Sequence, residues 1–380
     1  MTRPASIWPA SSAEADGPLA GLRVLDFSNW LPGPFCTQLF GDLGADVVKV
    51  EAPDGDPGRG GTGWVFDAAN RNKRSLVADL KQAGDRAACL RLAAGADIVV
   101  EGFRPGVADR LGIGYDAIRA VRPDVVYCSI SGYGQTGPWR HRAGHDLSFL
   151  AASGALHAAP HWRAAAPRRS PVAVADLSAA FYAAVAILAA LRERDRNGQG
   201  AHLDIAIADA ALAVASPRAG LDFAVKPEER HGVYPNNDLY RAADGQWITV
   251  AAVEPKFWEG LRGTLAAWAP ALADARFDDE AGRRAHGDDL CDLLATAFAQ
   301  RPAADWVALF EDRDVPVDRV VGVAEAVRSE QTRARGIVAA CDGAELVVFP
   351  VLKDGDVLGR FHSRPPALGP RVGDWVAVES

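Results

Sequence analysis

Short apolar runs alternate with helical segments along the first part of the chain. Runs rich in Val, Ile and Leu occur at 21–28, 45–51, 74–80, 96–103 and 123–132. Helical segments lie between them. One of these, 34–44, begins with Pro and ends at Gly, as helices often do. Because strands that alternate with helices are typical of βαβ units, we predict an α/β fold with a Rossmann-like, mostly parallel sheet.

A long apolar helix is predicted after this region. We expect it to begin at Asp176, as its N-cap, and to end at the sequence Asn-Gly-Gln-Gly at 197–200. Nearly every face is apolar before Arg192, which indicates a buried helix. A further strand and helix are predicted within 202–214.

The pattern changes near Gly232. Residues 239–254 predict two strands around an Asp-Gly turn. Three helical patterns follow, at 255–268, 287–300 and 302–312. These elements are typical of a small α+β unit.

These patterns divide the chain into predicted domains. Residues 18–215 together with 335–380 form a large α/β domain, and residues 216–334 form a linker and a small α+β domain. Residues 1–17 are rich in Pro, Ala and Ser and lack the apolar core of a signal peptide, so we expect a flexible leader.

Composition excludes several classes of function. The chain of 380 residues has a formal net charge of −8 and no long basic run, which argues against a nucleic-acid partner. No apolar stretch of membrane-spanning length lacks charges, so no membrane span is predicted. The cysteines are scattered and form no C-x-x-C pair, which argues against a zinc site or disulfide framework and favours a cytoplasmic location: Cys36, Cys89, Cys128, Cys291 and Cys341.

The sequence Gly-Tyr-Gly-Gln-Thr-Gly at 132–137 matches a dinucleotide-binding pattern and follows a predicted strand. The segment 138–142 after it has no helical period, which a dinucleotide site would require. We therefore interpret 132–137 as a tight loop at the carboxyl end of a strand, where ligands bind in open α/β sheets.

Three polar residues interrupt apolar surroundings and are candidates for chemistry. His145 follows the glycine-rich loop, Asp176 opens the long helix, and Glu254 ends a predicted strand. Each has a structural alternative: a loop histidine with a hydrogen bond, a helix N-cap, and a second cap. Asp176 could also act as a nucleophile or proton carrier, with N–H groups at the helix start holding an oxyanion.

Ordered segments over about residues 20 to 375 resemble the family III CoA-transferases, a family that also contains the α-methylacyl-CoA racemases. The segments that carry the resemblance are 21–56, 70–81, 100–118, 127–138, 187–212, 333–338 and 365–369. The resemblance implies an interlocked homodimer with a large α/β domain and a small domain. It also implies a substrate that is a coenzyme A thioester, with no prosthetic group and no metal.

The resemblance also implies a coenzyme A site. Asn72, Lys73 and Arg74 would lie around the adenine and phosphates, and Phe103 and Arg110 along the pantetheine. The remaining residues expected at this site are Arg104, Gly144 and Asp146.

Two activities within the family place Asp176 in different roles. In the transferases this aspartate forms a mixed anhydride with the acyl group, and exchange through a thioester follows. In the racemases it is one of two bases, and the other is a histidine in a Gly-His-Asp sequence, which matches His145 here. A glutamate in a Glu-Pro-x-Phe segment supports that histidine, and Glu254 matches it.

These matches favour an acyl-CoA racemase that acts at the α-carbon of a 2-methyl-branched thioester. His145 and Asp176 would then transfer a proton on opposite faces of an enolate, and an N–H group after Asp176 would hold the oxyanion. The alternative is a CoA-transferase that uses Asp176 as its nucleophile and needs no histidine. Residues 177–180 resemble the transferase branch. A third reading is a protein that binds CoA thioesters without turnover.

Overall fold

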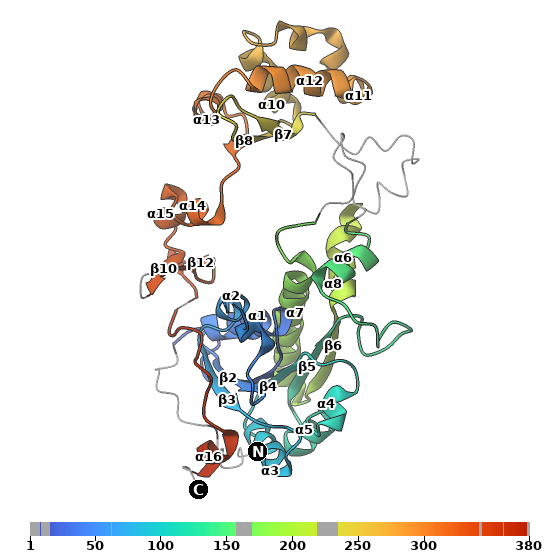
Figure 1. The fold of residues 1–380 in the computed structure, drawn as a ribbon, viewed down its shortest axis with the longest axis vertical. Coiled ribbons are helices and arrows are strands. Elements are labelled where there is room, and N and C mark those ends of the chain that lie inside the picture. The colour runs from blue at the N-terminus through green and yellow to red at the C-terminus, as the bar shows by residue number, and fades with distance from the viewer. Residues whose placement is uncertain are drawn as a thin grey trace. The chain divides into compact units, whose positions relative to one another are not determined.

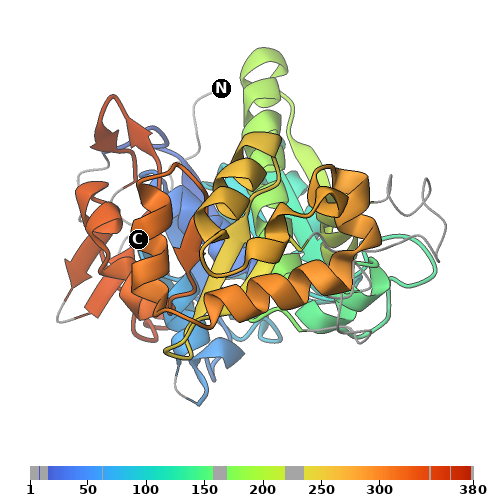
Figure 2. The same cartoon turned by 90° about the horizontal axis from the view of Figure 1, so that it is seen from above.

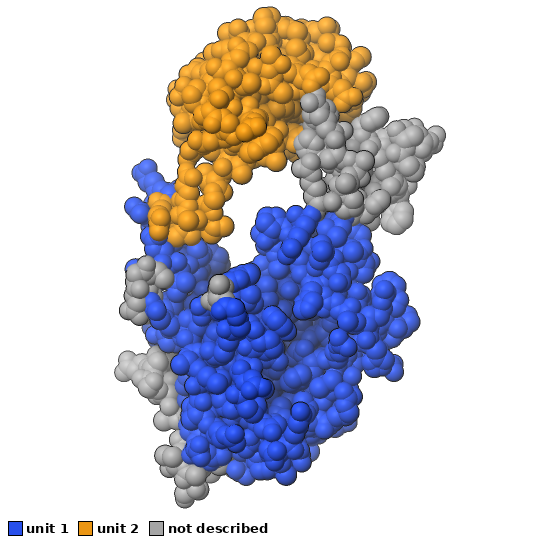
Figure 3. All heavy atoms as spheres, viewed as in Figure 1, with its two compact units in different colours: residues 1–156, 169–217, 329–380 blue, residues 157–168, 218–328 orange. Residues whose placement is uncertain are grey.

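The computed structural model describes Trp8 and residues 16–61, 63–156, 169–218, 235–341, 344–359 and 361–377. Its contacts divide the chain into two compact units, coloured in Figure 3. Unit 1 contains residues 1–156, 169–217 and 329–380, and unit 2 contains residues 157–168 and 218–328.

Unit 1 is built on a six-stranded parallel sheet in the order β3-β2-β1-β4-β5-β6. The predicted α/β fold with a Rossmann-like sheet is thus confirmed. The order reverses between β1 and β4, which is the point where ligands bind in such sheets. The strands are β1 (Arg23–Phe27), β2 (Asp46–Glu51), β3 (Lys73–Val77), β4 (Ile98–Glu101), β5 (Val126–Ser131) and β6 (Ala201–Ala206).

Helices cover both faces of this sheet (Figure 1). Val24, Ile98 and Val126 face a core shared with α1 (Pro32–Asp42), α6 (Asp146–Ala152), α7 (Val174–Asn197) and α8 (Ile207–Ala215). Leu25, Val99 and Tyr127 face the other core, shared with α3 (Ala83–Ala93), α4 (Val107–Arg110), α5 (Tyr115–Val121) and α16 (Val372–Ala377). Alternate residues along each strand therefore serve opposite cores.

The long helix α7 begins before Asp176. Its N-cap is Ala173, so the prediction that Asp176 is the N-cap is wrong. The helix ends as predicted, because Gly198 adopts the left-handed conformation (φ 73°) that closes many helices.

The prediction that α7 is buried on nearly every face is also wrong within one chain. An alanine-rich face is buried, whereas Phe181, Tyr182, Val185 and Leu188 are exposed. In length and composition α7 could cross a membrane, with 44% of its apolar window buried inside the protein. The core helix of a soluble protein has the same features, so this observation is weak evidence for a membrane.

Unit 2 contains the antiparallel strands β7 (Asn237–Arg241), β8 (Trp247–Ala251) and β9 (Val317–Arg319). The two predicted strands and their Asp-Gly turn are confirmed, and so are the three predicted helices. Helices lie on one face of this sheet in both views (Figures 1 and 2). They are α10 (Pro255–Leu265), α11 (Glu280–Ala285), α12 (Gly287–Phe298) and α13 (Ala303–Glu311). The core between them holds Trp258, Phe298 and Trp306.

The remaining elements are short. They are η1 (Pro57–Arg59), α2 (Trp64–Ala69), η2 (Ser216–Arg218), η4 (Pro270–Ala273), η5 (Ala275–Phe277), α14 (Val323–Val327), α15 (Glu330–Ala334), β10 (Val338–Cys341), β11 (Ala344–Val347), β12 (Leu352–Lys353) and β13 (Asp356–Val357).

Most of the predicted leader 1–17 lies outside the described residues. Within it, Trp8 is 5% exposed and packs in the core with α3 and α16. Its indole N–H donates to the Asp46 carboxylate at 2.7 Å. This position is therefore anchored to the sheet.

Candidate active site and coenzyme A site

The starts of α6 and α7 bring Asp146 and Asp176 together. The Asp146 carboxylate Oδ1 accepts hydrogen bonds from the backbone N–H of Ala175 at 2.8 Å and of Asp176 at 3.3 Å. Asp146 is the first residue of α6, so one helix supplies the capping carboxylate of the other. The Gly-His-Asp sequence is thereby placed at the predicted catalytic aspartate.

The N–H groups at the start of α7 already have acceptors. Besides the two bonds to Asp146, Val174 N donates to Val172 O at 2.9 Å and Leu177 N to Ala173 O at 3.0 Å. These acceptors compete with a bound oxyanion, and our expectation that an N–H group at this helix start holds one stays a prediction.

The Asp176 side chain is partly buried, and its acidity is shifted. Burial, and then the nearby charge of Asp146, raise the pKa of Asp176 to about 7. At neutral pH the side chain therefore populates both the carboxylate and the carboxylic acid. It can serve as a nucleophile or base in one form and as a proton donor in the other.

His145 is exposed at the start of α6. Its backbone carbonyl accepts from Ser148 N at 2.7 Å, and its backbone N–H donates to Ser148 Oγ at 3.4 Å. The imidazole lies edge-on to the Trp30 indole, with ring centroids 6.0 Å apart. The histidine is thus fixed through its backbone, and its ring contacts Trp30.

Gly144 has a packing reason to lack a side chain. A Cβ at Gly144 or at Gly132 would lie 2.6 Å from Phe149 Cε1. The Phe149 ring on α6 therefore needs both glycines, and this contact positions the loop before His145.

Two of the residues expected around the adenine and phosphates are held inside the fold. Lys73 Nζ donates to Asp26 Oδ2, Pro34 O and Asn70 Oδ1, and its side chain is 0% exposed. Burial, opposed by Asp26, lowers the pKa of Lys73 to about 8. Asn72 Oδ1 accepts from His362 N at 2.7 Å and Ser363 N at 2.9 Å, which ties the C-terminal segment to the sheet.

Arg74 forms an ion pair with Asp46 at 2.6 Å and is half-buried. The contacts of Asn72 and Lys73 within the fold favour structural roles for these two residues, whereas the Arg74 side chain remains partly exposed.

The other predicted coenzyme A residues follow the strand-order reversal. Phe103 N donates to Glu101 Oε2 at 2.7 Å at the end of β4. A Cβ on Gly102 would lie 3.3 Å from Ser28 Cβ, so the loops after β1 and β4 are in contact. Arg104 and Arg110 are exposed beyond them. In open α/β sheets ligands bind in a crevice at such a strand-order reversal, so we expect one between these loops.

Sequence reasoning missed Glu101. It is 3% exposed, and burial raises its pKa to about 7, although hydrogen bonds from Ser129 and the Phe103 N–H oppose the shift. Its signal in the sequence was an acidic residue at a strand end before a Gly-Phe-Arg-Pro-Gly run.

Glu254 is the N-cap residue of α10 in unit 2 and is exposed. Its side chain makes no capping hydrogen bond. Its predicted support of His145 stays a prediction.

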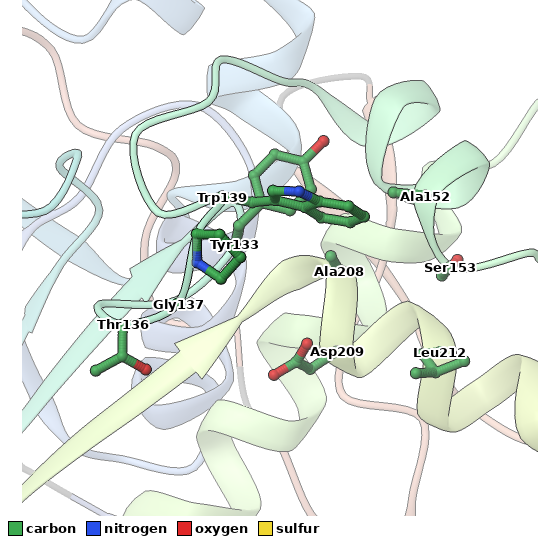
Figure 4. Close-up of a pocket in the computed structure, with 10 residues that line it drawn as sticks. Tyr133, Thr136, Gly137, Trp139, Ala152, Ser153, Ala208, Asp209 and Leu212 are labelled. Atoms are coloured by element: carbon green, nitrogen blue, oxygen red, sulfur yellow. The ribbon is translucent and has the colours of Figure 1, made fainter.

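A pocket of about 340 Å³ lies beside the glycine-rich loop (Figure 4). Tyr133 and Trp139 form one side, with Asp209 and Leu212 of α8 and Ser153 at the end of α6 around it. Gln135 N in this loop donates to Asp204 at 3.0 Å. The loop interpretation of 132–137 is confirmed, since no helix follows directly. Among the described residues, no cluster of His, Cys, Asp and Glu could hold a metal ion.

The chain is similar to proteins of one family. The model of the CoA-transferase family III matches residues 19–372. An acyl-CoA transferase of Fusarium pseudograminearum is 33% identical, over 94% of this chain and 84% of that protein. Acetyl-CoA:oxalate CoA-transferase of Acetobacter aceti is 34% identical, over 93% of each.

The fold is similar to a solved structure as well. A CAIB/BAIF family protein from Brucella suis superposes with a TM-score of 0.83 and 30% identity, covering 96% of this chain and 99% of that one. Sequence and fold agree over nearly the whole length, and the chain belongs to the CoA-transferase family III.

Proposed function

We propose that this protein is a CoA-transferase that moves coenzyme A from an acyl-CoA to a free carboxylate, with Asp176 as the nucleophile. The observation that carries the proposal is the partly buried Asp176 carboxyl at the start of α7, fixed through its backbone by Asp146. The two relatives named above are themselves transferases, which supports the same reading.

The chemistry needs only this carboxylate and the two substrates. A carboxylate oxygen of Asp176 attacks the thioester carbonyl, the C–S bond breaks, and coenzyme A leaves as a thiolate. The acyl group is then held as a mixed anhydride. The thiolate attacks the Asp176 carbonyl of the anhydride, so the donor carboxylate departs and Asp176 carries coenzyme A as a thioester.

The acceptor carboxylate completes the exchange by the same steps in reverse. It attacks the aspartyl thioester, which releases the thiolate and forms a second anhydride. The thiolate then attacks the acceptor's acyl carbonyl. This step yields the new acyl-CoA and restores the Asp176 carboxylate, so no prosthetic group is required.

The crevice between the loops after β1 and β4 is the proposed coenzyme A site. Phe103 would lie along the pantetheine, and the exposed guanidinium groups of Arg104 and Arg110 would pair with phosphates. Arg74 has a partly exposed guanidinium and can join them. The buried contacts of Lys73 favour assigning it to the scaffold.

The racemase is the second candidate, because His145 precedes Asp146 in sequence and Asp146 binds the backbone of Asp176. The His145 ring is exposed and available to a proton on a bound thioester. Glu254 would support the histidine in this reading, as the resemblance implies. In this reading Asp176 delivers or removes the proton on the opposite face of the enolate.

One experiment separates the two candidates. The protein is incubated with a branched acyl-CoA and a carboxylate acceptor in D2O, and hydroxylamine is added to trap acyl–enzyme species. A transferase gives an adduct on the Asp176 peptide, which Asp176→Asn abolishes and His145→Ala retains. Deuterium at the α-carbon that disappears in His145→Ala would instead establish the racemase. The absence of both products would reject both candidates.

We also propose that the protein is a homodimer located in the cytoplasm. The exposed apolar face of α7 supports the homodimer. A continuous apolar stripe on a helix marks a surface that another chain covers, which favours the interlocked homodimer. The free cysteines Cys36, Cys89, Cys128 and Cys291 are buried and fit a cytoplasmic location.

A further inference from the structure

Trp30 has a backbone conformation that is unusual for its residue type. Among the described residues, four non-glycine residues have positive φ: Trp30 (66°), Asn72, Asp314 and Asp354. Asn and Asp tolerate the left-handed region, whereas a bulky aromatic residue is strained there. The strain in the loop after β1 must be held by its surroundings.

A buried ionic cluster holds this loop. Lys49 Nζ donates to Ser28 O at 2.6 Å and pairs with Asp56 at 2.9 Å, and both side chains are 0% exposed. Asp56 Oδ1 in turn accepts from Trp30 N at 3.3 Å. The backbone on both sides of Asn29 is therefore tied to charged groups of β2 and the turn after it.

The strained backbone does not place the indole in a core. The side chain is 47% exposed, and its ring lies edge-on to the His145 imidazole. Trp30 follows β1 at the strand-order reversal, and Gly102 packs against Ser28 in the same loop. The indole thus contacts the residue that precedes α6, and the first residue of α6, Asp146, binds the start of α7, which carries Asp176.

We propose that Trp30 is a specificity-determining residue whose indole contacts the acyl chain of the bound thioester. This inference rests on the proposed function, because it assumes that the thioester runs from the crevice towards Asp176. An exposed indole face offers apolar area and little hydrogen bonding. It therefore selects hydrocarbon acyl groups over small polar ones and leaves the coenzyme A moiety to the loops around Phe103.

The test uses equilibrium binding to the full-length protein of three probes: free coenzyme A and the non-hydrolysable thioether analogues of acetyl-CoA and octanoyl-CoA. Trp30→Asn removes the ring and keeps a residue suited to positive φ, whereas Trp30→Phe keeps an aromatic ring. Trp247→Thr is the control, since Trp247 is 49% exposed on β8 of unit 2. Circular dichroism checks that each variant is folded.

We expect Trp30→Asn to weaken octanoyl binding relative to acetyl binding by about tenfold or more, the range of one lost apolar contact in a pocket. Binding of free coenzyme A should change by less than about twofold. Trp30→Phe should recover most of the preference, and the control should match the wild type. Equal weakening of all three probes, or unchanged octanoyl preference, overturns the proposal.

Failure of the proposed function would look different. Wild-type protein that binds the thioethers but forms no Asp176 adduct would reject the transferase. The role of Trp30 would still be decided by the ratio of the two thioether affinities.

Discussion

Asp26 and Asp176 are both aspartates, but their pKa values are shifted in opposite directions. Asp26 is fully buried, and burial alone would raise its pKa, but Lys73, Lys49 and the hydroxyls of Ser28 and Thr37 lower the pKa to about 2. At Asp176, burial and then the nearby charge of Asp146 raise the pKa to about 7. The first carboxylate is committed to structure, and the second remains reactive near neutral pH.

The shift at Asp176 carries a cost in stability. Its folded pKa of about 7 lies above the ordinary value of 3.8 for an aspartate, so the unfolded chain ionises first and the protein loses stability as pH rises between these values. Asp176→Asn removes this charge. We expect its free energy of unfolding to exceed that of the wild type by about 1–3 kcal/mol at pH 8 and to match it near pH 3.8.

Denaturant unfolding at the two pH values measures this difference, with Asp209→Asn as the control on the exposed surface of α8. Activity of Asp176→Asn should fall by about a thousandfold or more, because the nucleophile is lost. A variant that loses stability at pH 8 would contradict the raised pKa.

The pH dependence of the rate tests the same group without a mutation. A nucleophilic carboxylate must be ionised, so kcat/KM for a transferase should rise with pH through about 7 and become flat above it. Below that value we expect the rate to fall about tenfold per pH unit. A flat profile from pH 5 to 8 would exclude Asp176 as the ionising nucleophile.

At the scale of elements, the start of α7 shows where sequence reasoning stopped. The helix itself, its glycine terminus and the nearby histidine were predictable from local patterns. The cap was not, because the carboxylate that binds Ala175 N and Asp176 N comes from α6, which is distant in sequence. A cap supplied from another helix leaves no signature at the usual spacing.

Asp146 therefore has two separable effects on its partner helix. Asp146→Ala removes the acceptor, and we expect a loss of about 1 kcal/mol in stability, as for other lost caps. Asp146→Asn keeps an acceptor oxygen, so it should lose less. Both substitutions remove the charge that helps to raise the Asp176 pKa, so both should move the acidic limb of kcat/KM to lower pH.

Thermal unfolding and pH–rate profiles of the two Asp146 variants measure these effects. Phe149→Leu serves as a comparison that perturbs α6 without changing charge. If Asp146→Asn leaves the acidic limb unmoved, the charge of Asp146 does not tune Asp176.

Across the whole chain, the sequence predicted the hydrophobic period and the order of the strands and helices. It did not predict the contacts between residues that are distant in sequence. Alternation of strands and helices predicted the parallel sheet, since each βαβ unit is local. The sequence around Asn72 and Lys73 is polar and resembles a ligand-binding stretch. Only the structure shows that Lys73 reaches Asp26 across the sheet and that Asn72 binds residues 362 and 363. The exposed face of α7 was not predicted for the same reason. The sequence of an apolar helix does not show whether its own chain or a second chain buries each face.

The exposed apolar face of α7 predicts that the protein assembles with a second chain. Phe181, Val185 and Leu188 lie three or four residues apart, so they share one side of α7. We expect sedimentation equilibrium to give a mass of twice 40.2 kDa that does not fall on dilution, because interlocked chains separate only when they unfold.

Val185→Glu places a charge at a valine that is 66% exposed in the single chain and should prevent assembly. Val323→Glu, at an 80% exposed valine of α14, is the matched control and should remain dimeric. A wild-type mass of one chain at every concentration would refute the homodimer, and a dimeric Val185→Glu would place the interface elsewhere.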